Sequence, residues 1–397
     1  MDSITNYLKK GEKHRQTGGI GLEVEHFLLN KENGKPMPYE EIEGLFQAIQ
    51  KDYPQAVYEK NHCVSLENEE CLITLEPGCQ LEVSFLYTSD LKRIEKAYQK
   101  AMAPIQAYVE KKGYEIIYSG GIPTVPVDSF KRIHKERYAL MEAYFENHGT
   151  RGKEMMKGTA AVHVSIDYAD EIDYIKKYRL ANILHPIFAF LSFNTPYYAG
   201  LKNEDLLLRD SIWKQTDADR CRIVDDLFDE HFSYQSYANY VWKVPLILMH
   251  KGNEFISVGS QSCKEVSKVY GTDEESIQHY LSMVFPNIRS KNFIEIRSAD
   301  CMPLVYTMAY CALIKGIFYQ TKMVDQYLGI AHSISEIEQA CQEIRQKDWQ
   351  AQVYGQEIVS FCKTLIEDAK NGLDANEGKL LDVYFNLIEN RKHIGDL

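Results

Sequence analysis

Short stretches in which apolar and polar residues alternate are spread along the chain, and they predict β-strands. Four of them are rich in β-branched residues or alternate in polarity, and Gly, Pro, Asn or Asp bounds each one. They span residues 20–30, 71–86, 161–168 and 291–298. Adjacent strands of this kind, joined by turns, favour antiparallel pairing.

Longer segments carry apolar residues at helical spacing. The stretch from Ile172 to Leu191 predicts a core helix, which Pro186 is expected to kink. The tail from about Ser333 to Asn390 predicts further helices, broken at "NGLDANEG" by Gly and Asn. Because strands and helices do not alternate as βαβ units, we expect an α+β fold rather than a doubly wound sheet. No repeat or linker divides the chain, so a single catalytic domain over residues 1–397 is predicted.

Glutamates occupy one face of the first predicted strand, in "GLEVEHFLLN". Residues i and i+2 of a strand point to the same side, so Glu23 and Glu25 lie opposite Leu22 and Val24. Two neighbouring carboxylates repel each other unless water or a cation reaches them. A strand with one solvated face is the simpler interpretation of this stretch alone.

Two further stretches repeat this arrangement. In "TLEPGCQLEVSF", Glu76 precedes a turn at Pro77 and Gly78, and Glu82 lies on the strand face opposite Leu81 and Val83. In "FIEIRSADCMPL", Glu295 and Arg297 share a face opposite Ile294 and Ile296. Together the three strands can form a sheet whose polar side is an acid-lined cavity. Magnesium prefers oxygen ligands and often bridges carboxylates and phosphates, so such a cavity can hold metal-bound ATP, with Arg297 against phosphate oxygens.

Other familiar site patterns are absent from the sequence. It contains no GxxxxGK[ST], no HExxH and no GxSxG. The isolated histidines His163 and His185 are interpreted as structural residues, because one imidazole without partners does not define a site. In "LLLRDSIWKQTDADR", Arg209, Trp213 and Arg220 are candidates for holding an acidic substrate, since an Arg fork grips a carboxylate; surface ion pairs are the alternative.

Composition narrows the classes of function. Hydrophobic residues make up 45% of the 397 residues, enough for a packed core. A net charge of −12 argues against a nucleic-acid partner held by a basic surface. The opening "MDSITNYLKKGEKHRQ" has no apolar signal segment, and no stretch approaches the roughly 18 apolar residues of a membrane span. We therefore expect a cytoplasmic protein without a membrane partner.

The nine cysteines are too sparse for a disulfide scaffold and form no CxxC pair. Cys63, Cys71 and Cys79 recur every eight residues, a spacing that matches no zinc motif. We interpret them as reduced, packed residues.

Five motifs, taken in order, carry a family resemblance. They are "GLEVEHFLL", "LEPGCQLEVS", "GTAAVHVSIDY", "RDSIWKQTDADR" and "FIEIRSAD", and "YRLANILHPIFAFLSFNTP" adds to them. The sequence resembles the glutamate–cysteine ligase family, in particular its plant-type branch with related bacterial enzymes. The resemblance covers about residues 18–304 as a motif-bearing core, and leaves residues 305–397 as a helical C-terminal part.

The resemblance implies a fold akin to the glutamine synthetase catalytic domain, in which a curved antiparallel sheet forms a funnel with helices outside. It also implies ATP-dependent ligation of glutamate to cysteine through a γ-glutamyl phosphate, the first step of glutathione biosynthesis. The implied ligands of Mg²⁺, or of Mn²⁺, are Glu23, Glu25, Glu76, Glu82 and Glu295. Glu295 and Arg297 are implied as catalytic residues. Arg297, Arg209, Trp213 and Arg220 are implied as contacts of substrate or ATP.

Two departures from the plant-type pattern bear on specificity. Cys79 replaces the second glycine of an EPGGQ turn, so a positive φ there would strain its side chain. The stretch "MMKGTAAV" lacks an arginine implicated in glutamate recognition, and Lys157 is not in register with it. A carboxylate–amine ligase of the same family with another amino acid substrate or another acceptor is therefore an alternative. Outside the ligases, paired carboxylates also fit a glycosidase or a calcium-binding module.

Overall fold

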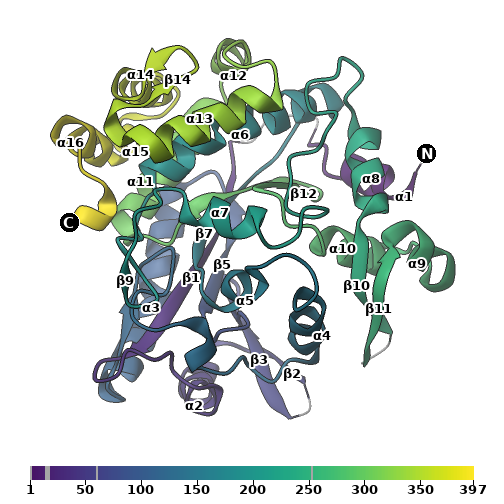
Figure 1. Cartoon of the computed structure of the whole chain (residues 1–397). Coiled ribbons are helices and arrows are strands. Elements are labelled where there is room, and N and C mark those ends of the chain that lie inside the picture. Colours follow the sequence, from purple (N-terminus) through teal and green to yellow (C-terminus); the bar gives the residue numbers. More distant parts are fainter. Residues whose placement is uncertain (1, 14–17, 60, 252–253) are drawn as a thin grey trace.

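A central antiparallel β-sheet with helices packed around it forms the body of the molecule (Figure 1). The computed structural model describes residues 2–13, 18–59, 61–251 and 254–397. This architecture confirms the predicted α+β class and the antiparallel strand pairing.

The sheet has nine strands, and its path runs β12–β13–β7–β1–β5–β4–β3–β2, with β6 paired to the second half of β1. Its strands are β1 (Ile20–Asn30), β2 (Gln55–Glu59), β3 (His62–Glu67), β4 (Cys71–Leu75), β5 (Leu81–Thr88), β6 (Tyr114–Ile117), β7 (Ala161–Ile166), β12 (Ile288–Ser290) and β13 (Ile294–Asp300). Within the described ranges β12 and β2 do not pair with each other, so the sheet is open rather than a closed funnel.

Three small hairpins lie outside this sheet. They are β8 (Tyr197–Tyr198) with β9 (Leu201–Lys202), β10 (Pro245–Lys251) with β11 (Glu254–Ser262), and β14 (Gln352–Val353) with β15 (Gln356–Glu357).

Helices cover both sides of the sheet. Those before β12 are α1 (Ser3–Lys9), α2 (Tyr39–Ile49), α3 (Leu91–Lys111), α4 (Glu136–Phe145), α5 (Gly152–Lys157), α6 (Glu171–Leu191), α7 (Leu208–Lys214), α8 (Tyr234–Lys243), α9 (Cys263–Tyr270) and α10 (Glu274–Ser282). Those after β13 are α11 (Leu304–Phe318), α12 (Thr321–Leu328), α13 (Ile334–Lys347), α14 (Ile358–Lys370), α15 (Ala375–Leu380) and α16 (Asp382–Asn390).

The apolar face of the sheet packs against α3, α6 and α11, which contact β5, β13 and β7 in turn. Leu22 and Val24 of β1 are fully buried on this side, as their alternation with glutamates predicts. The C-terminal helices continue the same packing, since α13 lies along α6 and α14 along α11 (Figure 1). Buried apolar residues from Ile4 to Ile394 belong to one contiguous cluster. No helix in the described ranges is long and apolar enough to cross a membrane.

Local patterns located only some of these elements. The predicted helix at 172–191 is α6, which runs unbroken through Pro186, and the break in "NGLDANEG" separates α14 from α15. The segment 71–86 is two strands around a turn. The segment 291–298 is misplaced, because residues 291–293 form the turn between β12 and β13. Strands β2, β3, β6, β10 and β11 were not predicted, nor was the break between α13 and α14.

Hydrogen bonds hold the turn between β4 and β5 and restrict the backbone conformation of its fourth residue, Cys79. The Cys79 amide donates to the Glu76 carbonyl at 3.0 Å, and the Gln80 side chain accepts from the Gly78 amide at 2.8 Å. Cys79 has a φ of 67°. This confirms the positive φ that the comparison with an EPGGQ turn raised as a possibility, and Cys79 bears the associated strain.

We expect Cys79→Gly to be more stable than Cys79→Ala by about 1–2 kcal/mol, because glycine adopts positive φ without the clash of a Cβ. Urea midpoints measure the difference. Cys71, in β4, is the matched control: there glycine should be the less stable of the two replacements by about 0.5–1 kcal/mol. A Cys79→Gly variant that unfolds at lower urea than Cys79→Ala contradicts the strain.

Candidate active site

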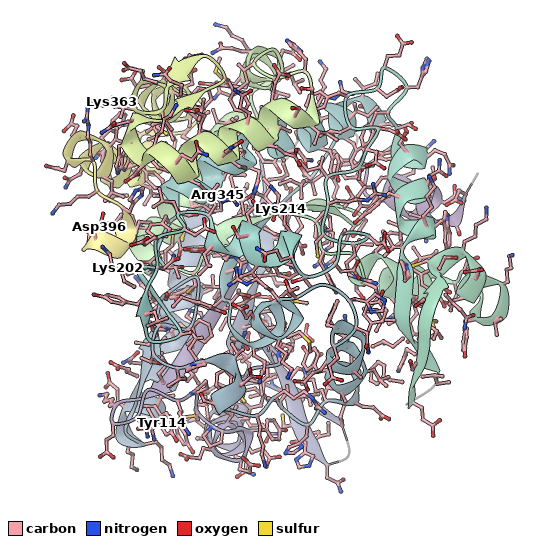
Figure 2. The ribbon with its side chains drawn as sticks, in the orientation of Figure 1. Tyr114, Lys202, Lys214, Arg345, Lys363 and Asp396 are labelled. Atoms are coloured by element: carbon pink, nitrogen blue, oxygen red, sulfur yellow. The ribbon has the colours of Figure 1, made fainter. Side chains whose placement is uncertain are left out.

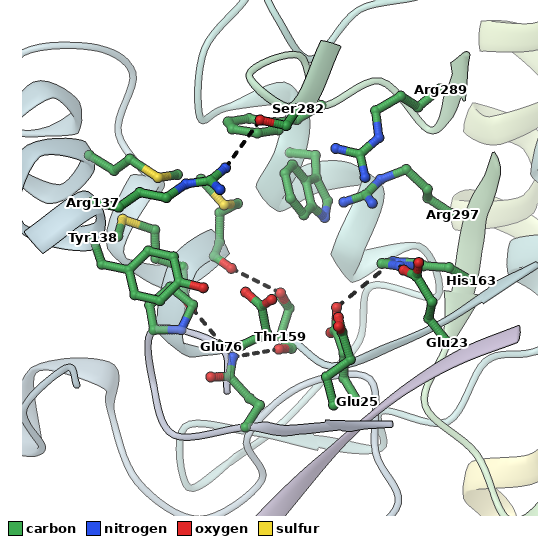
Figure 3. A pocket seen from close by; sticks show the side chains of 18 of the residues that line it. Glu23, Glu25, Glu76, Arg137, Tyr138, Thr159, His163, Ser282, Arg289 and Arg297 are labelled. Atoms are coloured by element: carbon green, nitrogen blue, oxygen red, sulfur yellow. Dashed lines mark hydrogen bonds and ion pairs between the residues drawn. The ribbon is translucent and has the colours of Figure 1, made fainter. Parts of the chain in front are cut away.

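A cavity of about 270 Å³ opens on the polar face of the sheet, and four of the predicted glutamates line it. These residues are Glu23 and Glu25 from β1, Glu76 from the β4–β5 turn and Glu82 from β5. We call this space the glutamate cavity. In Figure 3, Glu25 and Glu76 lie between Arg137 on one side and Arg289 and Arg297 on the other.

The strand register brings the acids together. Glu25 lies directly opposite Glu82 in the β1–β5 ladder, and Glu23 lies opposite His163 in the β1–β7 ladder. Side chains in such positions have Cβ atoms only about 4.5–5.5 Å apart, and like charges there oppose folding. Hydrogen bonds fix the orientations: Glu25 accepts from the Ala161 amide and Glu82 from the Thr74 hydroxyl, each at 2.8 Å.

The pKa values of these glutamates reflect their burial and their closeness to one another. Burial, together with the charge of Glu76, raises the pKa of Glu25 to about 8. Burial and the neighbouring Glu23 and Glu76 raise the pKa of Glu82 well above its usual range. For Glu23 burial acts in the same direction, but a hydrogen bond with His163 holds its pKa below the usual value. The cavity therefore contains acids whose charges lack compensation, which favours binding of a cation.

Glu295 is in a different environment. It is fully buried, and its carboxylate contacts Arg289 at 2.6 and 3.1 Å, Lys291 at 3.3 Å and Arg297 at 3.1 Å. Burial alone would raise its pKa, but these cations hold the pKa well below its usual range. All four acceptor positions of the carboxylate are used, so none is left for the predicted metal contact in this arrangement.

The three cations around Glu295 form one side of the glutamate cavity, which we call the basic wall: Arg289, Lys291 and Arg297. The Arg297 guanidinium also lies 5.5 Å from the ring centre of Trp213, which reaches the cavity from α7. The sequence therefore located Arg297 and Trp213 correctly at the site. It missed Arg289, which lies in the unpredicted strand β12, and Lys291, which lies on a turn that we had predicted to be strand.

Arg209 lies behind the acids, close to but not lining the cavity. Burial lowers its pKa, and the charges of Glu25 and Asp300 oppose this shift. Its Nε is 4.0 Å from an Asp300 oxygen, and its Nε and Nη1 have no hydrogen-bond partner among the described residues. Buried donors left unpaired are costly, so Arg209 keeps hydrogen-bonding capacity beside the glutamate cavity, as its predicted role requires.

Arg220 lies elsewhere, and the structure does not support its predicted substrate contact. Its side chain is fully buried, donates to Asp217, and donates to the Met283 and Pro245 carbonyls at 2.7 and 2.8 Å. Its guanidinium lies 5.2 Å from the ring centre of Tyr144 and 5.8 Å from that of Phe285, and it does not line the glutamate cavity. These contacts occupy its donors in the packing of the core.

Arg137, on α4, is a cavity residue that the sequence did not identify. Its Nη2 lies 3.5 Å from the Ser282 hydroxyl and its Nε has no hydrogen-bond partner, and within the described ranges it forms no ion pair. The charged segment "FKRIHKERY" gave no signal that distinguishes it from its basic neighbours. Arg137 thus provides a guanidinium for an acidic ligand.

The stretch "MMKGTAAV" contributes Met155, Met156 and Thr159 to the cavity. Lys157 points away from it, since its Nζ donates to the carbonyls of Val127 and Phe130. Lys157 therefore does not replace the arginine that the plant-type pattern has near this position. The nine cysteines are all buried and free, which confirms that Cys63, Cys71 and Cys79 are packed residues.

A cavity that sets clustered carboxylates against arginines is suited to a polyphosphate held with metal ions. The family model described as glutamate-cysteine ligase family 2 matches residues 19–371. The chain belongs to this family.

Known relatives agree with this assignment. The chloroplastic glutamate–cysteine ligase of Nicotiana tabacum is 28% identical over 327 residues, covering 80% of this chain and 62% of that enzyme. The Arabidopsis thaliana enzyme is 28% identical over 337 residues, covering 83% and 65%. The chain thus spans less than two thirds of both relatives. Glutamate–cysteine ligase from Francisella tularensis, solved in complex with AMP, shares the fold with a TM-score of 0.56 at 11% identity, covering 95% of this chain and 83% of that one.

We expect Arg220→Met to lower the free energy of unfolding by about 3–5 kcal/mol, because it leaves Asp217 buried without its partner. Urea titration measures the loss. Arg222→Met, which removes an exposed ion pair with Asp225, is the matched control and should cost about 1 kcal/mol or less. If Arg220→Met instead kept its stability and lost nucleotide binding, Arg220 would belong to the site.

Proposed function

We propose that the protein is an ATP-dependent ligase that joins the γ-carboxylate of L-glutamate to the amine of L-cysteine. The products are γ-glutamylcysteine, ADP and phosphate, and a γ-glutamyl phosphate is the intermediate. The observation that carries this proposal is the basic wall facing four clustered glutamates across one cavity, in a chain of this family. A ligase of the same family that uses a different amino acid is the alternative.

The glutamate cavity fits the metal ion that this reaction needs. Glu23, Glu25, Glu76 and Glu82 would hold Mg²⁺, or Mn²⁺, because they present only oxygen ligands. The raised pKa values of Glu25 and Glu82 indicate that the protein's own cations and hydrogen bonds only partly compensate the burial and mutual repulsion of these carboxylates. When bound, the metal neutralises charge on the phosphate oxygens.

The basic wall is suited to positioning the γ-phosphate. Arg297 and Arg289 reach the cavity while Glu295 fixes their orientation, so their donors are arranged before substrate arrives. Donors held in place in this way stabilise charge that develops in phosphoryl transfer without reorganising. In this proposal Glu295 is a positioning residue, whereas Arg297 contacts the reacting phosphate.

Arg137 is suited to the α-carboxylate of the amino acid donor, because it faces the cavity from the side opposite the basic wall (Figure 3). Met141, Met155 and Phe285 line the cavity near it and offer apolar surface to the substrate. With Arg137 at one end of the donor and the phosphate contacts at the other, a donor of glutamate's length would place its γ-carboxylate at the γ-phosphate.

An ADP-release assay over pairs of amino acids with Mg-ATP tests the proposed function. We expect glutamate with cysteine to release ADP and mass spectrometry to find γ-glutamylcysteine, with some turnover of 2-aminobutyrate because a small pocket discriminates by only about 1–3 kcal/mol. Glu82→Gln should reduce turnover by about a hundredfold or more. A dominant aspartyl product supports the alternative substrate, and no ADP with any pair contradicts a ligase.

We expect Arg137→Ala to raise KM for the amino acid donor about 10- to 100-fold while KM for ATP changes little, since a hydrogen bond to a charged group contributes about 1.5–3 kcal/mol. Steady-state kinetics separate the two constants. Arg132→Ala is the matched control, because Arg132 pairs with Glu142 and does not line the glutamate cavity. An Arg137→Ala enzyme with an unchanged KM for the donor contradicts this role.

A further inference from the structure

A second group of titratable side chains lies among the helices on the other side of β13 from the glutamate cavity. It consists of His185 on α6, Asp210 on α7 and Cys341 on α13, each at most 4% exposed. One ligand atom from each residue lies within 4.8 Å of the other two. We call this group the His–Asp–Cys cluster. None of its members lines the glutamate cavity, so the proposed ligase reaction does not use them.

The spacing of two of its ligand atoms matches that of a tetrahedral metal site. His185 Nε2 lies 3.3 Å from Asp210 Oδ1. Two ligands bound to zinc at about 2.0–2.1 Å and at the tetrahedral angle are themselves about 3.3 Å apart. A cavity of about 300 Å³ borders all three residues and gives an ion a path and room for a water molecule as fourth ligand.

The hydrogen bonds of His185 select the form that binds metal. The Asn287 side-chain nitrogen, a donor, lies 3.0 Å from Nε2, so Nε2 accepts and carries no proton. The proton is then on Nδ1, which donates to the Ser298 hydroxyl at 2.8 Å. Metal-bound histidines are commonly fixed in this manner by a partner on the other ring nitrogen. The Asn287 amide bridges His185 and Asp210, and a bound metal ion would displace it.

Two cations hold the far oxygen of Asp210: Arg345 at 2.5 Å and Lys214 at 3.1 Å, both labelled in Figure 2. Because both cations contact Oδ2, the other oxygen of Asp210, Oδ1, is the one that faces His185. Two acidic residues offset the positive charge of Arg345 and Lys214. Asp205 pairs with Arg345, and Glu338 lines the same cavity. Arg222 and Asp225, which also line this cavity, pair with each other. The named side chains thus carry one more negative than positive charge, which cancels the single positive charge that a zinc ion and a thiolate add together.

We propose that His185, Asp210 and Cys341 bind one thiophilic divalent cation of the Zn²⁺ class, at a site distinct from the glutamate cavity. On binding, the Cys341 S–H bond breaks, a metal–sulfur bond forms and the proton leaves to solvent. The ion joins α13 of the C-terminal helices to α6 and α7. Because α7 also carries Trp213 of the glutamate cavity, the ion steadies one wall of that cavity.

Cobalt is the probe that distinguishes this site, because thiolate ligation of Co²⁺ gives a charge-transfer absorption that oxygen ligands in the glutamate cavity cannot give. The chelator-treated full-length chain should develop this band with one equivalent of Co²⁺ and lose it when Zn²⁺ is added. Cys341→Ser should abolish the band. Cys362→Ser, a buried cysteine on α14, is the matched control and should keep it.

A second variant covers the case in which Cys341→Ser does not fold. His185→Gln retains the thiol and should weaken Co²⁺ binding at least tenfold, and Zn²⁺ should raise the Tm of the unaltered chain but not that of this variant. A folded chain without a thiolate band overturns the proposal. So does a band that persists in Cys341→Ser, or equal affinity in His185→Gln.

Discussion

The register between β1 and its two neighbours is the constraint on which the rest of the site depends. It sets Glu25 directly across from Glu82 and Glu23 across from His163. A slip of one residue would turn these carboxylates into the apolar core and expose Leu22 and Val24, so burial of the apolar face enforces the register. The free energy gained on that face thereby offsets the repulsion on the other face, where the acids are held ready for a cation.

The buried glutamates of this sheet have different roles, and the groups that contact each carboxylate determine its role. Glu295 has a cation at every acceptor position and orders the basic wall. Glu25 and Glu82 accept hydrogen bonds from a backbone amide and from hydroxyl groups, and within the described ranges no cation contacts them as Arg289 contacts Glu295. The arginines also differ in their partners. Arg297 lines the cavity, and Arg209 lies beside it with N–H donors that have no hydrogen-bond partner among the described residues. Arg220 donates to backbone carbonyls of the core.

Helix α7 links the two clusters of the molecule. Its residues have different surroundings: Trp213 lines the glutamate cavity and Arg209 interacts with Glu25 beside it, whereas Asp210 pairs with Arg345 of α13 and with Lys214. The C-terminal helices therefore do more than cover the sheet, because α13 contributes Arg345 and Cys341 to the surroundings of Asp210. These contacts join α13 to the helix that carries Trp213 of the cavity wall.

The sequence by itself determined which strands carry acids and which face each acid occupies, because a period of two residues is a local property of an extended chain. It thus located Glu23, Glu25, Glu82 and Arg297, together with α6 and the break near residue 371. The tertiary structure alone decided which charges meet. Whether Glu295 is free or saturated depends on Arg289 across a hairpin, and the side chain of Arg220 has partners in four parts of the chain, at Tyr144, Asp217, Pro245 and Met283. Arg137 and the His–Asp–Cys cluster were not predicted for the same reason: their partners lie far away in sequence, and only the packing of the helices and strands brings them together.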